Sequence, residues 1–325
     1  MSNLPLAERP PRAALQAVAL LLSLITPLAA QQAPSRPAVL GTWDLTLHTS
    51  DGRTLPSWLY LHSSGNGVLV GRFVGVVGSV RPISRLTLTN DTLRFALPPQ
   101  WEGGDADLQF AGTLRNDTLY GTITDPRGTA YPFHGVRAPA LRHATPAWAA
   151  APRRLFNGKD LTGWHTVGGT NQWSVVNGVL SNAKGGANLV TDGKYSDFVL
   201  HVEVKYPERG NSGIYLRGRH EVQVEDPAVT KEDAEGTGGL GAIYGFLMAN
   251  QEAANGPGKW EVLDVTLVGR RVTVVVNGKR IICDAEIPGT TGGALDSNEG
   301  EPGPIMLQGD HGPVEYRNLT IRVPR

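Results

Sequence analysis

Polar and ionisable side chains are concentrated in residues 210–227, GNSGIYLRGRHEVQVEDP, where they alternate with apolar ones. Successive side chains of a β-strand point to opposite faces, so this alternation predicts two strands, each with an apolar and a polar face. If the strands pair as a hairpin around Gly218, a carboxylate, an amide and a guanidinium share the polar face, a set that can move protons and hold oxyanions. The polar face would carry Tyr215, Arg217, Glu221, Gln223 and Glu225, and the apolar face Ile214, Leu216, Val222 and Val224.

A second interpretation of this stretch needs no chemistry. Antiparallel hairpins with one solvated face commonly carry the same residue types, and on alternation alone this interpretation is favoured. His311, in the loop Gly-Asp-His-Gly, has the same two interpretations, a turn residue or a site histidine beside Asp310. The single cysteine, Cys283, excludes an internal disulfide and a cysteine-based zinc site, and its apolar surroundings predict a buried position.

The composition indicates a mostly β protein, and the N-terminal segment indicates export. The chain has 325 residues with 40% hydrophobic and 18% charged residues, 40 Gly, 23 Pro and three Met, which favours short strands joined by many turns. Arg9 and Arg12 precede an apolar run that ends in small residues at Ala29-Ala30, as in a secretory signal over residues 1–30. We therefore expect a periplasmic or extracellular protein. A retained membrane anchor is the alternative, but Pro27 interrupts a run that is short for a bilayer span.

The mature chain is almost neutral. Without residues 1–30 it has 28 basic and 29 acidic residues, a net charge of −1. This balance favours neither nucleic acid nor an anionic membrane as a partner.

Residues 41–137 are expected to form an antiparallel β-barrel, after a flexible Pro-rich lead-in at 31–40. In the first strand, Trp43, Leu45 and Leu47 share a face, and seven further short runs follow at about 54–62, 67–74, 83–89, 92–97, 107–114, 118–124 and 129–136. Eight short strands in about a hundred residues are typical of an up-and-down barrel. The opening Gly41-Thr42-Trp43 resembles the Gly-x-Trp entry of lipocalin-like barrels.

A second domain is predicted from residue 153 to 325, after a Pro- and Ala-rich linker at 138–152. Its strands alternate clearly, for example at 198–206, and Val276-Asn277-Gly278 indicates a hairpin turn. The interval 226–259 is long and rich in Gly and acidic residues, so it is a candidate loop over a site.

Several motifs of this second domain resemble the 3-keto-disaccharide hydrolase domain family, which has a concanavalin- or laminarinase-like jelly-roll fold. They are LFNGKDLTGW (155–164), W-x-V-x-x-G-V-L (173–180), GNSGIYLRGRHEVQV (210–224), GAIYG (241–245) and GPIMLQGDHGPVEYRNLTIR (303–322). The resemblance implies an all-β chain with a jelly-roll sandwich after the barrel, from a bacterial exported protein that acts on glycosides oxidised at C3. Lys259-Trp260-Glu261 departs from the family's Gly-Glu-Trp-Asn motif, because Lys259 stands at the Glu position and Glu261 at the Asn position.

The resemblance also implies a chemistry. A ketone at C3 acidifies the hydrogen on C2, so a base can remove it and the enolate can expel the C1 substituent, with or without later addition of water. Glu221 or His311 would be the base, and Arg217 would hold the enolate. Glu225 and Asp226 are the candidate ligands if a hard divalent metal takes part. Substrate contacts are expected from Asn211, Tyr215, Gln223, Tyr244, Trp260 and Gln308.

Two other functions compete with this one. Jelly rolls are shared by lectins and hydrolases, so the chain could be a carbohydrate-binding module without chemistry. A conventional retaining glycosidase needs two carboxylates about 5–5.5 Å apart. Glu221 and Glu225 are the nearest candidates, but four residues along a strand span roughly 13 Å.

Overall fold

The computed structural model describes residues 37–232 and 238–325, and Ala38–Arg325 forms one compact unit. The expected signal sequence at 1–30 lies outside the described residues, as does most of the lead-in at 31–40. Among the described helices, none has the length and apolar character needed to cross a membrane.

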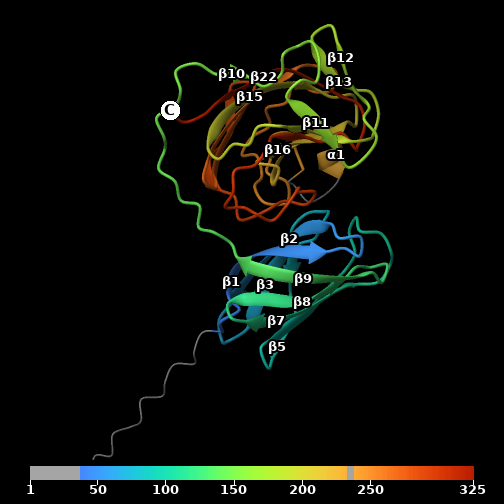
Figure 1. Cartoon of the computed structure of the whole chain (residues 1–325), viewed down its shortest axis with the longest axis vertical. Coiled ribbons are helices and arrows are strands. Elements are labelled where there is room, and N and C mark those ends of the chain that lie inside the picture. The colour runs from blue at the N-terminus through green and yellow to red at the C-terminus, as the bar shows by residue number, and fades with distance from the viewer. Residues whose placement is uncertain (1–36, 233–237) are drawn as a thin grey trace, which may run out of the picture. The chain divides into compact units, whose positions relative to one another are not determined.

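Residues 41–137 form a nine-stranded antiparallel sheet that curls into a nearly closed barrel, blue to green in Figure 1. The strand order is β4-β3-β2-β1-β9-β8-β7-β6-β5. Nine strands replace the eight expected because the run at 83–89 is divided. Pro82 lacks an amide donor and confines the short β4 to the sheet edge. The strands are β1 (Gly41–His48), β2 (Thr54–Ser63), β3 (Leu69–Val74), β4 (Arg81–Ile83), β5 (Leu86–Thr89), β6 (Thr92–Leu97), β7 (Leu108–Arg115), β8 (Thr118–Thr124) and β9 (Ala130–Arg137).

The barrel core follows the predicted alternation. Trp43, Leu45 and Leu47 of β1 are buried together in it. Two of its hairpins turn at Asn-Asp pairs whose residues all have positive φ, as tight hairpin turns require. Asp44, between two of the core residues, is buried as well, on the opposite face of β1.

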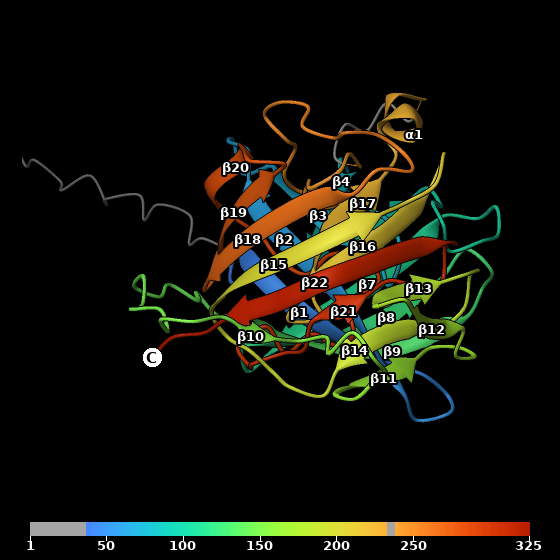
Figure 2. The ribbon, with the colours of Figure 1, turned by 90° about the horizontal axis from the view of Figure 1, so that it is seen from above.

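Residues 153–325 form a sandwich of two antiparallel sheets, whose strands Figure 2 shows from above. The eight-stranded sheet has the order β12-β13-β22-β15-β18-β19-β20, with β10 paired to β22, and the five-stranded sheet has the order β11-β14-β21-β16-β17. The larger sheet consists of β10 (Arg153–Arg154), β12 (Trp173–Val176), β13 (Val179–Asn182), β15 (Phe198–Lys205), β18 (Glu261–Val268), β19 (Arg271–Val276), β20 (Lys279–Glu286) and β22 (Val314–Arg322). The smaller consists of β11 (Trp164–Val167), β14 (Asn188–Thr191), β16 (Asn211–Leu216), β17 (His220–Glu225) and β21 (Met306–Leu307).

One apolar core fills the space between these two sheets. β15 supplies Phe198, Leu200, Val202 and Val204 to it, as its alternation predicts, while the residues between them stay partly exposed. The predicted all-β architecture, a barrel followed by a sandwich, is confirmed.

The burial predicted for Cys283 is wrong, because this cysteine is exposed. The pairing of β19 with β20 shifts in register around Val274, and Asp284 adopts a positive φ. Such a bulge breaks the two-residue period of a strand. Ile281 and Ile282 are consequently both buried, and Cys283 turns outward.

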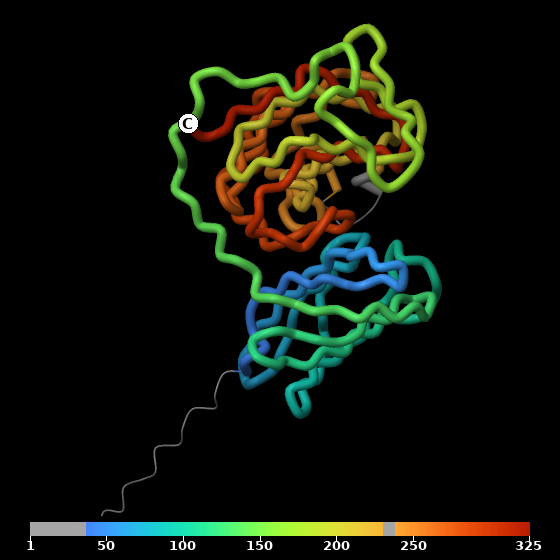
Figure 3. The backbone as a smooth tube through the Cα atoms, viewed as in Figure 1, coloured from blue at the N-terminus to red at the C-terminus, as the bar shows by residue number. Residues whose placement is uncertain are grey.

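The segment 138–152, green in Figure 3, makes backbone hydrogen bonds to the sandwich. Arg270 N donates to Leu141 O at 3.2 Å, and Ala149 N donates to Val323 O at 2.9 Å. The barrel and the sandwich also touch directly, since the hydroxyls of Thr46 and Ser297 lie 2.6 Å apart. The division into two domains at this segment stays a prediction.

Candidate functional site

β16 and β17 form the predicted hairpin at one edge of the five-stranded sheet. Ile214 and Val222 are paired and face the sandwich core, whereas Tyr215 is paired with Glu221 on the other face. The assignment of these four residues to the two faces is confirmed. The polar face is not solvated, however, since every residue of β17 is buried and Glu221 is only 3% exposed.

Glu221 is a buried carboxyl group with one well-defined neighbour. Burial raises its pKa to about 8, while the hydrogen bond from Tyr215 and the charge of His311 act in the opposite direction. Tyr215 Oη lies 2.9 Å from Glu221 Oε2. Burial and the adjacent carboxylate raise the pKa of Tyr215 well above its usual range, so the phenol keeps its proton.

Gly213 makes room for this carboxyl group. A Cβ at position 213 would lie 2.2 Å from Glu221 Oε1, closer than any real contact. Only glycine therefore allows Glu221 to lie flat across β16. This explains a residue of the motif that the sequence left without a role.

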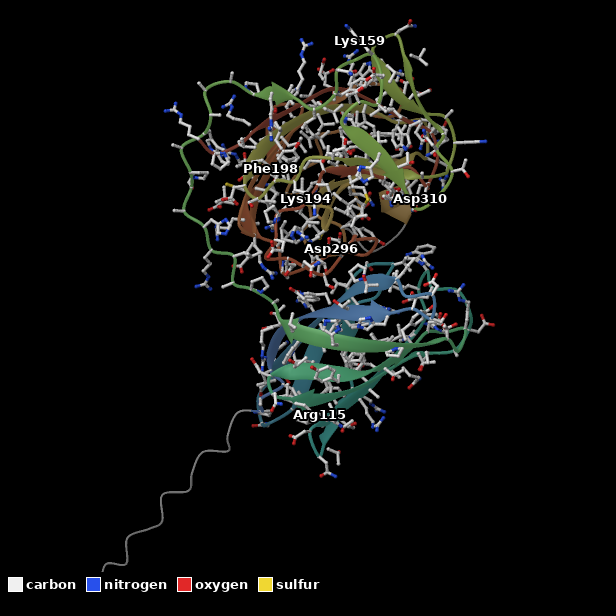
Figure 4. The ribbon with its side chains drawn as sticks, viewed as in Figure 1. Arg115, Lys159, Lys194, Phe198, Asp296 and Asp310 are labelled. Carbon is white, nitrogen blue, oxygen red and sulfur yellow. The ribbon has the colours of Figure 1, made fainter. Side chains whose placement is uncertain are left out.

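His311 lies in the loop between β21 and β22, next to Asp310, which is labelled in Figure 4. Its Nδ1 lies 2.7 Å from Asp310 Oδ1, and the side chain is 44% exposed. The Asp310 carboxylate raises the pKa of His311, and the charge of Glu221 acts in the same direction. The charge of His311 lowers the pKa of Glu221 in turn, so the titrations of the two groups are linked.

The loop that carries His311 is held by side chains from neighbouring strands. Asn182 Nδ2 donates to Gly309 O at 2.9 Å and to Gly312 O at 2.7 Å. Gly309 N donates to Asn188 Oδ1 at 2.8 Å. These bonds bracket the histidine on both sides, so its position depends on β13 and β14 rather than on the loop alone.

Three further predicted residues lie close to Glu221. Gln308 N donates to Gly213 O at 2.9 Å, and within the described part of the chain its Oε1 is buried without a hydrogen-bond partner. Tyr244 N donates to Glu221 O at 3.1 Å. Through this bond the predicted loop at 226–259 pairs with the outer edge of β17. Gln223 lies on the same face as Glu221 and is buried, with its Oε1 accepting a bond from Val224 N.

The loop between β20 and β21 covers the face that carries Tyr215 and Glu221. The sequence did not indicate this cover. Thr291 Oγ1 accepts a hydrogen bond from Glu221 N at 3.0 Å, and Gly292 O lies 2.9 Å from Tyr215 Oη. Gly293 N then donates to Val76 O of the barrel at 2.9 Å. The Gly-Thr-Thr-Gly-Gly run at 289–293 was the signal that could have revealed a close-packed loop.

Arg217 does not join Glu221. It adopts a positive φ in the turn after β16, so the alternation of the strand ends before it. Its guanidinium donates to Gly269 O at 3.0 Å and lies 3.3 Å from His220 Nε2, and burial lowers its pKa to about 10. Arg217 instead belongs to a buried charged cluster with Asp44, Arg219, His220, Arg270 and Glu299.

Trp260 lies apart from the site as well. Its ring is placed between Arg317 and Lys205, at 4.0 and 5.1 Å from the ring centroid. These two residues point outward from β22 and β15, whose neighbouring side chains fill the core. Trp260 is therefore on the outer face of the eight-stranded sheet, whereas Glu221 belongs to the five-stranded one.

The two candidate metal ligands accept hydrogen bonds within the protein. Asp226 accepts hydrogen bonds from Arg209 N at 2.8 Å and Ala228 N at 3.0 Å, the second as the cap of helix α1 (Pro227–Glu232). Glu225 Oε1 accepts from Asn211 Nδ2 at 3.4 Å. Over residues 37–232 and 238–325, no group of three His, Cys, Asp or Glu is arranged to hold a metal ion.

The site thus brings together two linked titratable groups of different exposure. Glu221 is buried under a loop and bonded to Tyr215, and the His311–Asp310 pair is half-exposed. Perturbed, coupled groups of this kind are typical of general acid–base chemistry.

Residues 151–322 match the family model of the 3-keto-alpha-glucoside-1,2-lyase-like domain. The chain is similar to the structure of a candidate glycosyl hydrolase from Parabacteroides distasonis ATCC 8503, with 30% identity and a TM-score of 0.46 over 57% of this chain and 92% of that chain. A second such structure from the same organism has 25% identity and a TM-score of 0.43 over 53% and 99%. The carbohydrate-binding module CBM66 from Bacillus subtilis has 16% identity and a TM-score of 0.34 over 49% and 94%. None of the curated proteins matches the chain.

Proposed function

The chain belongs to the family of 3-keto-alpha-glucoside-1,2-lyase-like domains, and on this premise we propose that it cleaves glycosides oxidised to a ketone at C3, by eliminating the C1 substituent. The observation that carries the proposal is the Tyr215–Glu221 pair beside the His311–Asp310 pair. Together they offer a base and an acid whose pKa values are both raised, that of Glu221 by burial and that of His311 by the Asp310 carboxylate.

Glu221 is the base in this proposal. A buried carboxylate with a raised pKa is a stronger base than a solvated one, and the Tyr215 hydroxyl stabilises its ionised form. The carboxylate takes the proton from C2, and the electrons of the C–H bond form the C2–C3 double bond of an enolate. The C3 carbonyl acidifies this hydrogen, so an unoxidised glycoside does not react.

His311 is the acid. The enolate oxygen re-forms the C3 carbonyl, the electrons of the C2–C3 double bond form a C1–C2 double bond, and the bond between C1 and the glycosidic oxygen breaks with its electrons on that oxygen. His311, kept protonated by Asp310, gives its proton to the leaving oxygen. Water that adds at C1, with a proton returned to C2, would convert the lyase product into the free 3-keto sugar.

The buried Gln308 Oε1 supports a role in substrate binding. A buried acceptor without a partner costs free energy, and a sugar hydroxyl would satisfy it. Asn211, which lies on the same face of β16 as Tyr215, is the next candidate for a contact with a sugar hydroxyl. Export of the protein also belongs to this proposal, because periplasmic or extracellular glycosides would then be the substrates.

The test is to incubate the purified protein with a 3-keto α-glucoside and with its unoxidised parent. We expect turnover of the ketone alone, and a loss of about 10²- to 10⁴-fold in rate in Glu221→Gln, the usual cost of losing a general base. Glu203→Gln, on the outer face of β15, is the matched control and should keep the wild-type rate.

Three results would contradict the proposal. Equal turnover of both glycosides would indicate a conventional glycosidase, and binding of the ketone without turnover would indicate a binding module. Wild-type rates in both Glu221→Gln and His311→Ala would reject the assigned residues.

A further inference from the structure

The mouth of the barrel contains a cavity of about 280 Å³ that no part of the proposed reaction uses. Its floor is apolar and comes from the barrel core, with Leu47, Phe73, Leu108 and Ile123. Hydroxyl groups of a sugar would find no hydrogen-bond partners against such a floor. The floor therefore selects an apolar or aromatic group.

Two exposed apolar side chains stand at the rim of this cavity. Trp101 is 74% exposed, the most exposed of the large hydrophobic residues described, and Val77 is 37% exposed. The exposed indole of Trp101 lies beside an apolar floor, so it can stack on a planar ligand. The ligand would then shield the indole from water.

The acidic residues at the rim are already paired. Glu102 lies 2.5 Å from Arg81, and Asp125 Oδ1 accepts hydrogen bonds from Arg127 N and Thr129 N. These carboxylates therefore call for no cation. An uncharged aromatic group therefore fits the rim better than a cation.

A chain of hydrogen bonds links the cavity wall to Glu221. Val76 lines the cavity, and its carbonyl accepts the hydrogen bond of Gly293 N. The preceding residue, Gly292, has its carbonyl 2.9 Å from Tyr215 Oη, which contacts Glu221. The path from Val76 O to the Glu221 carboxylate therefore consists of three hydrogen bonds and one peptide unit. The distance between these two groups is about 11 Å or less.

We propose that the barrel-mouth cavity binds the aromatic aglycone of the substrate, so that the barrel selects aryl glycosides for the sandwich to cleave. This inference rests on the proposed function, because it assigns the leaving group of the same reaction. The barrel then extends the site beyond the sugar, and the loop at 289–293 is one of the contacts between barrel and sandwich.

The test uses one variant that removes the stacking ring, Trp101→Ala, and one that fills the cavity, Leu55→Trp. Tyr120→Ala removes an exposed aromatic ring outside the cavity and is the control. Binding of free 2-naphthol is measured by calorimetry, and kcat/KM is measured for the 3-keto forms of methyl and 2-naphthyl α-glucoside. Melting temperatures identify any variant that fails to fold.

We expect Trp101→Ala to weaken 2-naphthol binding and to lower kcat/KM for the naphthyl ketone by about tenfold each, the usual worth of an aromatic contact. The methyl ketone should change less than twofold, and Tyr120→Ala should match the wild type. Equal 2-naphthol binding in all four proteins, or none in the wild type, would overturn the proposal. Turnover of neither ketone, with 2-naphthol binding that depends on Trp101, would reject the reaction and still support the aromatic site.

Discussion

Tyr215 Oη lies 2.9 Å from Glu221 Oε2 and, on its other side, 2.9 Å from the carbonyl oxygen of Gly292. A phenol has one proton, so it donates to Glu221 when that carboxyl is ionised. When Glu221 is protonated, the carboxyl can donate to Tyr215 and Tyr215 to Gly292. Both protonation states are therefore hydrogen-bonded without movement of heavy atoms, as a group that takes and returns a proton requires.

Tyr215→Phe should raise the pKa of Glu221 further, because the hydrogen bond from the phenol stabilises the ionised carboxylate. The acidic limb of the kcat/KM profile for a 3-keto α-glucoside should then move to higher pH. Tyr120→Phe, on an exposed part of β8, should leave the profile in place. An unchanged acidic limb in Tyr215→Phe would show that this carboxyl does not control the rate.

Glu221 should also leave a mark on stability. Its pKa is near 4.5 in the unfolded chain and about 8 in the folded protein, so folding binds a proton between these values. The stability of the wild type relative to Glu221→Gln is greatest below pH 4.5 and falls as pH rises toward 8. Urea unfolding of both proteins at pH 5, 6.5 and 8.5 measures the trend.

Glu203 provides a control for that experiment, because no trend is expected from it between pH 5 and 8.5. Hydrogen bonds from Asn318 and Arg317 hold its pKa below the usual value despite partial burial. The stability of the wild type relative to Glu203→Gln should therefore be lost only as pH falls below 4.5. If the stability of the wild type relative to Glu221→Gln instead rose with pH, the raised pKa of Glu221 would be contradicted.

Gly213→Ala should lower activity more than any other alanine substitution of a strand glycine that keeps the fold. The new Cβ would lie 2.2 Å from Glu221 Oε1, so the carboxyl must move away from Tyr215. A misplaced catalytic group typically costs about 10²-fold in rate. Gly300→Ala, whose Cβ would meet nothing closer than 3.6 Å, should be silent in the same turnover assay.

Asp310→Asn should shift the pH at which His311 loses its proton. The Asp310 carboxylate raises the pKa of His311, so its removal should move the basic limb of the kcat/KM profile to lower pH. Asp192→Asn breaks a similar pair, in which His165 Nδ1 lies 2.7 Å from the carboxylate, at a place remote from Glu221. A shift in both variants would point to a general charge effect instead.

Arg217→Ala should act on folding rather than on substrate binding. Arg217 is buried among Glu299, Gly269 and His220, and removal of one partner from a buried charged cluster costs about 3–5 kcal/mol. Arg317→Ala removes a partly exposed ion pair with Glu203 on the outer face of the sheet and should cost less than about 1 kcal/mol. Urea unfolding separates the two, and an unchanged stability in Arg217→Ala would contradict the structural role.

The sequence alone determined which residues share a face. Alternation is a local property of the strand backbone, so it placed Ile214 and Val222 in the core and Tyr215 with Glu221 on the other side, as the structure confirms. The same local rule placed Trp43, Leu45 and Leu47 together in the barrel core. It failed where the backbone leaves the strand conformation, at the positive φ of Arg217 and at the bulge beside Cys283.

Only the tertiary structure decided what these faces meet. The loop that covers Glu221 comes from about seventy residues further along the chain, and its Thr291 and Gly292 contacts cannot be inferred from strand periodicity. That cover removes water from the carboxyl and raises its pKa, which gives a strand glutamate the property on which its proposed role as a base depends. Burial depends on the whole fold, whereas alternation depends on neighbours in sequence, and this is why one was predictable and the other was not.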